Sequence, residues 1–239
     1  MFVSTERLDD VAVLSLARDE KRNAISMALA DELTSAVDAV ADSARAVVIT
    51  GEGSCFSAGA DLSEDKVGPG FFNSFDALTD AIRTADAPVI AYVNGPAIGA
   101  GTMLTLACDI RVIAPQAQFR IPVGDVAIGV SEWVVRALSD LVGGARARTM
   151  LYTGLPLIAD EAVACGFGLA GQYDDALEIA RLVAAKAPLT QRSIKMQFAP
   201  ELYSAEQRTA ATAAPFASED IREAARARAE KRPPRFTGR

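Results

Sequence analysis

The chain has 239 residues, half of them hydrophobic, so it is long enough to bury a sizeable core. Lysine and arginine total 24 against 31 aspartate and glutamate residues, a net charge of −7, which argues against nucleic-acid binding because that function rests on neutralising phosphates. Histidine is absent, which excludes Ser-His-Asp and Cys-His catalysis and any histidine-ligated metal within the chain.

Apolar periodicity and turn residues predict an alternation of strands and helices along the first half of the chain. In chain order we predict strands at residues 2–8 and 11–16, a helix at about 27–41, a strand at 46–50, a helix at about 71–84, a strand at 89–93, a helix from about 99 and a strand at 109–114. Strands and helices that alternate at this spacing indicate an α/β fold with crossover connections.

The second half of the chain is predicted to be almost entirely helical, from Ser131 to about Glu230. Within it, Pro188 in "APLTQ" suits the first turn of a helix. A boundary near Pro200 divides the chain into a core of residues 1–199 and a C-terminal helical segment of residues 200–239.

Three cysteines, Cys55, Cys108 and Cys165, lie far apart with no CxxC pair. This argues against a disulfide framework or a zinc site and fits a reducing cytoplasm, so we expect a cytoplasmic protein without a metal. The N-terminus "MFVSTERLDD" does not have the pattern of a signal peptide. No apolar stretch reaches the roughly 18 residues that span a bilayer, so no transmembrane segment is expected.

Two glycine-rich loops, "CFSAGADL" and "GPAIGAG", each follow a predicted strand, and the second leads into a helix. Glycine lets the backbone turn its N–H groups outward, and the start of a helix leaves N–H groups unpaired. Together the loops could direct two N–H donors at one carbonyl oxygen, which would form an oxyanion hole. Alternatively, both are ordinary strand-to-helix turns.

With these loops, the sequence resembles the crotonase superfamily of enoyl-CoA hydratases and isomerases. The segments that carry the resemblance are "EKRNAIS", "VVITGEGSCFSAGADL", "APVIAYVNGPAIGAGTMLTLACDIRVIAPQAQFRIP", "LVGGARARTMLYTG" and "EKRPPRFTGR". The resemblance implies a superhelix of repeated ββα units, a CoA thioester as substrate or ligand, and no further cofactor. It also implies a homotrimer, or a dimer of trimers, whose C-terminal helices cover a neighbouring subunit. Residues 200–239 would then serve oligomerisation and cover the CoA.

The resemblance also implies specific positions. The oxyanion donors would be the backbone N–H groups of Ala60 and Ala100, where Ala100 replaces the more common glycine. The segment along the CoA nucleotide would be Arg22, Asn23 and Ala24. Ala100 remains a donor if its local φ suits alanine.

The C-terminal tail holds a cluster of cations that could bind the phosphates of CoA. The cluster consists of Arg226, Arg228, Lys231, Arg232, Arg235 and Arg239, with one acid, Glu230, among them. Alternatively, these cations belong to a solvated helix end, where they are favourable anyway. Lys231 is the best single candidate for a CoA contact.

Hydratases of this family use two glutamates, and the matching positions here are Met103 and Val123. Hydration needs both a base and an acid, so apolar residues at both positions would remove the reaction and leave a drier pocket that suits an acyl chain. Trp133 is expected to be a core or pocket-wall residue.

Two other acids could carry a proton, Asp125 and Glu132. Asp125 would share a face with Val123 if the segment were a strand, although a Gly-Asp turn is the simpler interpretation. Glu132 follows Ser131 at an apparent helix start, where an N-cap serine and an acid in the first turn are ordinary. Asp61 is expected to brace the first loop.

Three functions are therefore open. The favoured one is a protein of fatty-acyl-CoA metabolism that binds acyl-CoA through an oxyanion hole with little or no hydratase activity. The alternative is an active isomerase, or a weak hydratase, in which Glu132 or Asp125 carries the proton. A scaffold or partner subunit is a third class, but the two intact loops argue against it.

Overall fold

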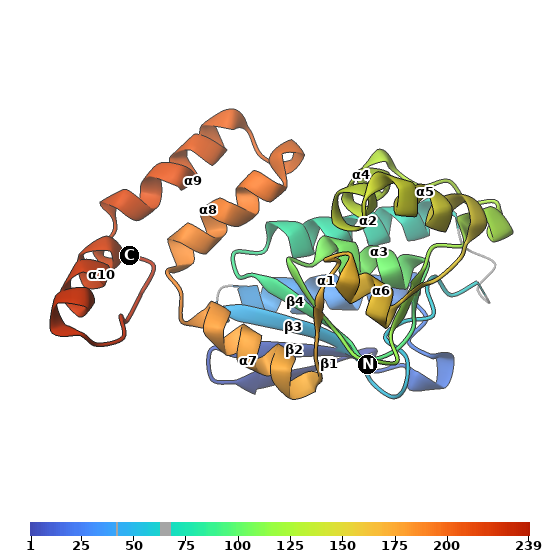
Figure 1. Cartoon of the computed structure of the whole chain (residues 1–239), viewed down its shortest axis with the longest axis horizontal. Helices are drawn as coiled ribbons and strands as arrows, with labels where there is room; N and C mark the ends of the chain where they lie inside the picture. Colours follow the sequence, from blue (N-terminus) through green and yellow to red (C-terminus); the bar gives the residue numbers. More distant parts are fainter. Residues whose placement is uncertain (42, 63–67) are drawn as a thin grey trace.

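The computed structural model describes residues 1–41, 43–62 and 68–239 of a chain built around a six-stranded sheet (Figure 1). The strands lie in the order β1 (Val3–Leu8), β2 (Val11–Leu16), β3 (Ala46–Gly51), β4 (Val89–Val93), β6 (Ile110–Ile113) and β9 (Leu169–Ala170). β1 and β2 form an antiparallel hairpin, and the other neighbouring strands run parallel. Crossover helices cover such a sheet, so its central strands are continuous apolar runs.

Both faces of the sheet are covered by helices (Figure 1). Side chains alternate along β3, so Val47 and Ile49 join the core under α1 (Met27–Ala41), α2 (Pro69–Thr84) and α3 (Ala100–Ala107). Ala46 and Val48 pack on the opposite side, against α7 (Tyr173–Ala184). The sequence predicts α1 and β4 with the bounds that the structure has.

A second, three-stranded sheet consists of very short strands, β5 (Ala97–Ile98), β7 (Gln118–Arg120) and β8 (Leu157–Ile158), in the order β5-β7-β8. The 3-10 helix η1 (Asp19–Lys21) precedes α1, and a second one, η2 (Val123–Val126), follows β7. The helices α4 (Glu132–Val142), α5 (Gly144–Thr153) and α6 (Ala159–Ala164) complete the core.

The chain ends in a helical arm that projects from the core (Figure 1), made of α8 (Pro188–Phe198), η3 (Pro200–Leu202), α9 (Ala205–Ala217) and α10 (Glu219–Glu230). Pro188 is the first residue of α8, as the sequence predicts. Lys195 anchors α8 to the core through an ion pair of 2.9 Å with Asp109. By contrast, α9 has no buried residue. The predicted boundary near Pro200 falls on η3, between the anchored helix and the outer ones.

None of the helices among the described residues is long and apolar enough to cross a membrane.

Candidate functional site

The first glycine-rich loop, residues 52–61, lies directly against β5. Ser57 pairs with Ala97, and the Ile98 N–H donates to the Ser57 carbonyl at 2.9 Å. Gly59 has a φ of +93°, and a Cβ atom there would lie 2.6 Å from the Ile98 carbonyl oxygen. Only glycine allows this close approach, and so the sequence places glycine in the loop.

The second loop turns from β5 into α3 at Gly99, whose φ of +53° is in the left-handed region. The Gly99 N–H donates to the Arg120 carbonyl at 2.7 Å, which ties the turn to β7. A Cβ atom at Gly101 would lie 2.6 Å from the Ser57 carbonyl oxygen, so the two loops touch through backbone atoms. Ala100 is not among the residues with positive φ, so its backbone suits alanine.

The two loops leave two backbone N–H groups without an acceptor among the described residues. Ala60 pairs with Ile25 in a parallel bridge, but the residues on either side of Ala60 make the hydrogen bonds of this bridge. The Ile25 N–H donates to the Gly59 carbonyl, and the Asp61 N–H donates to the Ile25 carbonyl. The N–H of Ala60 itself therefore points to the other side. Ala100 is the first residue of α3, where an N–H has no partner within the helix.

Both residues line one cavity of about 310 Å³. Its other walls come from α2, η2 and the start of α4. Met103, Val123 and Trp133 are also in the lining, so the structure brings together the residues that the sequence assigns to the oxyanion donors and the acyl pocket. The remaining apolar side chains of the wall include Phe71, Phe72, Phe75, Ile98, Val126, Ile128 and Val130.

One carboxylate lines this cavity among the described residues, and the sequence did not single it out. It belongs to Asp76 on α2. Partial burial raises the pKa of the Asp76 carboxyl, and the nearby Asp80 carboxylate raises it further. The signal available in the sequence is that Phe72 and Asp76 are four residues apart and so lie on one face of the predicted helix.

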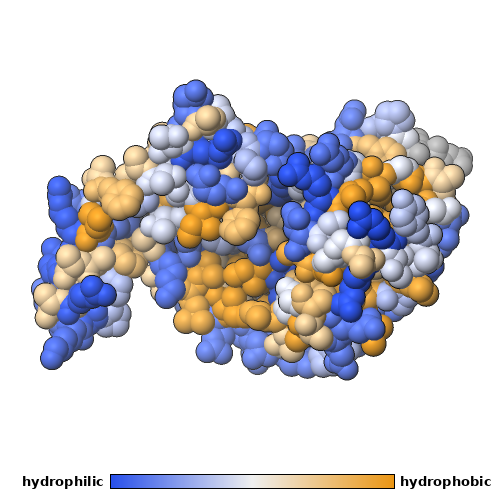
Figure 2. Space-filling view, turned by 45° about the horizontal axis from the view of Figure 1, so that its top comes forward, coloured by the Kyte–Doolittle hydropathy of each residue, from blue (hydrophilic) through white to orange (hydrophobic). Residues whose placement is uncertain are grey.

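Trp133 connects the cavity to the helical arm. Its ring lies under the Arg83 guanidinium, at 4.7 Å from the ring centroid, and Arg83 forms ion pairs with Asp80 and with Glu201 of η3. Trp133 also lines a second cavity, of about 580 Å³, between α3, α4 and α8. Hydrophobic residues gather in the hollow between arm and core (Figure 2).

Glu132 and Asp125, the two acids that the sequence suggests as proton carriers, do not line the cavity. The Glu132 side chain is 83% exposed and pairs with Arg136 at 3.6 Å, while Ser131 accepts a capping hydrogen bond from the Val134 N–H. Asp125 pairs with Arg120 at 3.1 Å and is 61% exposed.

The strand geometry that would put Asp125 on the same face as Val123 does not occur. The segment is the 3-10 helix η2, which agrees with the simpler interpretation as a turn, and residues two apart in it point in different directions.

The segment expected along the CoA nucleotide has a structural role that the sequence does not reveal. The Asn23 amide is fully buried and donates to the carbonyls of Glu52 and Cys55, at 2.9 and 2.8 Å. Its side chain is therefore committed to the first loop. The Arg22 carbonyl accepts from the Ala58 N–H, so this residue also supports the loop, while its side chain is exposed. Ala24 is buried, at 8% exposure.

Asp61 holds the same loop from its other end. Its carboxylate lies 2.7 Å from Arg18 in a largely buried ion pair, and Arg18 also donates to the Ala24 carbonyl. This contact is the brace that the sequence predicts for Asp61.

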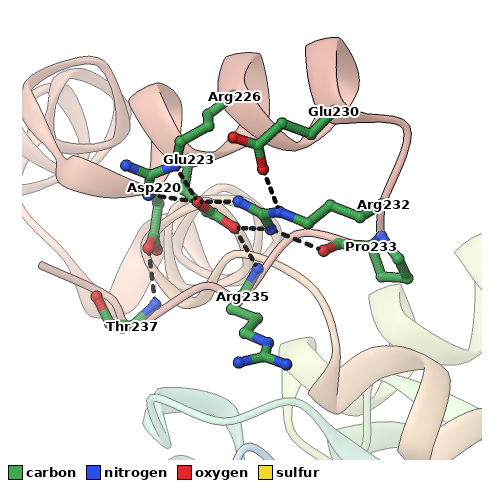
Figure 3. A network of polar contacts seen from close by, with 8 residues as sticks. All are labelled: Asp220, Glu223, Arg226, Glu230, Arg232, Pro233, Arg235 and Thr237. Carbon is green, nitrogen blue, oxygen red and sulfur yellow. Dashed lines mark hydrogen bonds and ion pairs between the residues drawn. The ribbon is translucent and has the colours of Figure 1, made fainter.

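The cation cluster of the tail is largely paired within the tail itself (Figure 3). The Glu223 side chain, 8% exposed, accepts from the guanidinium groups of Arg226 and Arg232 and from the Arg235 N–H. These bonds hold the pKa of the Glu223 carboxyl well below its usual range. Glu230 is the one acid within residues 226–239, and the structure adds a second, because Glu223 folds into the cluster from one turn earlier in α10.

Asp220 fixes the end of the tail in the same way. It accepts from the N–H groups of Thr237 and Gly238, at 2.7 and 2.9 Å. Lys231, the candidate CoA contact, ends α10 with a φ of +54°, and its side chain forms no ion pair or hydrogen bond with another described residue. Helix α10, which Lys231 ends, lies on the arm, away from α4 (Figure 1).

The fold and the two loops define a crotonase-type α/β protein, and comparison with known proteins agrees. The model of the enoyl-CoA hydratase/isomerase family matches residues 6–239, and the chain belongs to this family.

Among its relatives is the probable enoyl-CoA hydratase echA6 of Mycobacterium tuberculosis, 38% identical over 99% of this chain and 100% of that protein. A putative enoyl-CoA hydratase of Thermus thermophilus is 38% identical over 95% of this chain and 97% of that protein. The crystal structure of enoyl-CoA hydratase from Bacillus anthracis superposes with a TM-score of 0.90, at 28% identity and 100% coverage of both chains. The predicted fold, including its C-terminal helices, is thereby confirmed.

Proposed function

We propose that this protein binds acyl-CoA thioesters in the 310 Å³ cavity, with the thioester oxygen between the N–H groups of Ala60 and Ala100. The observation that carries the proposal is the pair of unpaired backbone donors on the wall of an otherwise apolar cavity. A buried N–H without a partner is costly unless a ligand supplies an acceptor. A thioester supplies one carbonyl oxygen together with an apolar chain, which matches both features of the wall.

The proposed function also means that the protein has little or no hydratase activity toward enoyl-CoA. Adding water to an enoyl thioester requires one group to activate the water and another to protonate the α-carbon. The side chains of Met103 and Val123 on the wall can do neither. The donors at Ala60 and Ala100 polarise the carbonyl, but they move no proton.

A proline substitution tests the oxyanion assignment directly. Ala100→Pro removes one donor at the first position of α3, where helices tolerate proline. Because a net hydrogen bond contributes about 0.5–1.5 kcal/mol, we expect acyl-CoA binding to weaken up to about tenfold in calorimetric titrations. Free CoA, which has no thioester carbonyl, should bind nearly unchanged.

The matched control is Ala205→Pro, which places proline at the first position of α9, away from the cavity. It should leave both affinities unchanged. Equal weakening of acyl-CoA and free CoA by Ala100→Pro would contradict the assignment of the donors.

We further propose that the protein is a homotrimer or a dimer of trimers. The support is the arm, whose helix α9 buries no residue and whose Phe198 and Phe216 are 83% and 73% exposed. Large apolar side chains on such a surface are typical of an interface. Light scattering should give a mass well above the 25.1 kDa of one chain, and a mass of one chain at micromolar concentration would rule this out.

A further inference from the structure

The cavity contains a group that can carry a proton, and it is not one of the acids that the sequence suggests. Of the described residues in its wall, Asp76 is the one with an ionisable side chain. Glu132 and Asp125 are absent from the wall and are engaged with Arg136 and Arg120. Asp76 is therefore the side chain whose position allows it to carry a proton in this cavity.

The position of Asp76 follows from the packing of α2. Phe71 and Phe75 are buried and stacked at 5.9 Å between centroids, and they fix the inner face of the helix. Phe72 contacts Phe71 edge-on at 5.6 Å between centroids, lines the cavity and is 37% exposed, so it lies where the wall meets solvent. Asp76 follows Phe72 by one turn on the same face. It lines the cavity and is itself an exposed residue, so it lies on the wall at the border with solvent.

The surroundings of Asp76 suit a base. Among the described residues, none forms an ion pair or a hydrogen bond with its carboxylate. Its neighbours on the wall, Phe72 and Phe75, are apolar. A carboxylate without a cation beside an apolar wall holds a proton more readily than one in water, which brings it closer to the range useful for proton transfer. The direction of the Asp76 pKa shift agrees with this environment.

We propose that Asp76 is the catalytic proton carrier of this cavity and that it acts on 3-enoyl-CoA thioesters. The proposal rests on the function proposed above, because the donors of Ala60 and Ala100 must first hold the thioester oxygen. It assigns double-bond isomerisation, which needs one proton carrier, in place of hydration, which needs two.

The step is balanced without any co-reactant. The α-C–H bond of the thioester breaks, its proton passes to a carboxylate oxygen of Asp76, and the electron pair moves onto the thioester oxygen as a dienolate. Return of the proton to the α-carbon regenerates the substrate. Delivery to the γ-carbon produces the 2-enoyl isomer and restores the Asp76 carboxylate. Because Asp76 borders solvent, its proton exchanges with water between the two transfers.

The experiment uses the full-length protein with 3-hexenoyl-CoA in deuterium oxide. Mass spectrometry follows deuterium incorporation, ultraviolet absorbance follows the conjugated product, and protein is in excess so that differences in affinity do not enter. We expect the wild type to exchange and isomerise, and Asp76→Asn to slow both by about 10²-fold or more, the usual contribution of a positioned acid–base group. Binding of a saturated acyl-CoA should change less than about threefold, because the net contribution of an ordinary hydrogen bond is small.

The matched control is Asp38→Asn, which removes an exposed carboxylate from α1, outside the cavity wall. It should stay within about threefold of the wild type, because Asp38 touches neither the wall nor Asp76. If Asp76→Asn lowers acyl-CoA binding, Asp76→Ser at saturating protein provides the same comparison.

The other outcomes separate this inference from the proposed function. Exchange by Asp76→Asn at the wild-type rate overturns the role of Asp76, and loss of exchange in Asp125→Asn or Glu132→Gln would assign the proton there. A wild type that binds acyl-CoA but shows no exchange above buffer overturns the inference and leaves the binding function intact. A wild type that binds no acyl-CoA contradicts the binding function itself.

Discussion

The cavity and the C-terminal tail differ in whether their polar groups are hydrogen-bonded within the protein. At the cavity wall, Ala60 and Ala100 present N–H groups that have no acceptor among the described residues. In the tail, Glu223 accepts hydrogen bonds from two guanidinium groups and one backbone N–H (Figure 3). The cavity keeps its hydrogen-bonding capacity for another molecule, whereas the tail uses much of its own internally.

This difference shows how to weigh two kinds of sequence signal. A cluster of cations indicates an anion site only after the carboxylates that fold onto it have been counted. Small residues at a strand-to-helix turn are a weaker compositional signal, but at Ala60 and Ala100 they leave donors open toward a cavity. Unpaired groups are therefore the better guide to a ligand site.

The largest expected effect is a gain of hydratase activity when two glutamates are added to the cavity wall. Met103→Glu together with Val123→Glu places two carboxylates beside the oxyanion donors. Desolvation and mutual repulsion should raise the pKa of at least one, so that a base and an acid coexist near neutral pH. Hydration of crotonyl-CoA, followed by absorbance, should rise by about 10²-fold or more over the wild type.

Each single variant should do little, because the reaction needs both groups. Val126→Glu with Ile128→Glu is the matched control, since it adds two carboxylates to other positions of the same wall. Hydration by the wild type at an ordinary turnover of roughly 1–10³ per second would instead show that the apolar wall does not prevent the reaction.

A smaller effect is expected from opening the tail network. Glu223→Gln removes the charge that holds Arg226 and Arg232, so the Arg235 N–H should lose its protection from hydrogen exchange by about tenfold, the equivalent of one net hydrogen bond. Glu219→Gln, which removes an exposed carboxylate from the start of the same helix, is the matched control.

The pH dependence of that protection has a defined sign. The folded-state pKa of Glu223 is lowered, so the contribution of Glu223 is fully present above the ordinary glutamate pKa of about 4.3 and is lost only as the pH falls below it. Protection of the tail in the wild type should therefore persist through pH 5 and weaken below about pH 4, whereas Glu223→Gln should show no such transition. Loss of protection in the wild type already near neutral pH would contradict the network.

The smallest effect is expected for CoA affinity when residues 231–239 are deleted. Arg226 and Arg232 are paired with Glu223, so only part of the cation cluster remains for phosphates. We expect the Kd for CoA to rise about three- to tenfold at low salt, with a shallower salt dependence, because screened phosphate contacts are lost. Acyl-pantetheine, which lacks the nucleotide phosphates, should bind unchanged. If the affinity for CoA is also unchanged while the oligomer persists, the tail is a structural element only.

Much of the core follows from the sequence because its signals are local. Helix α1 and strand β4 have the predicted bounds, since a 15-residue amphipathic helix and a five-residue buried strand each carry their own periodicity. By contrast, the sequence does not predict the pairing of β5 with β7 or of β7 with β8. Strands of two or three residues are too short to show a periodic pattern of apolar residues.

Local sequence patterns are enough to predict the α/β alternation, the two glycine-rich loops and the family resemblance, since each depends on neighbouring residues. Which groups meet depends on how the folded chain packs. Only packing shows that Asp76 of α2 joins the wall formed by Ala60 and Ala100, and that Glu132 and Asp125 stay outside it. Likewise, the pairing of Glu223 with Arg232 depends on the chain reversing after α10. The physical reason is that local patterns fix elements, whereas pairing and desolvation depend on distances between segments that the sequence order does not contain.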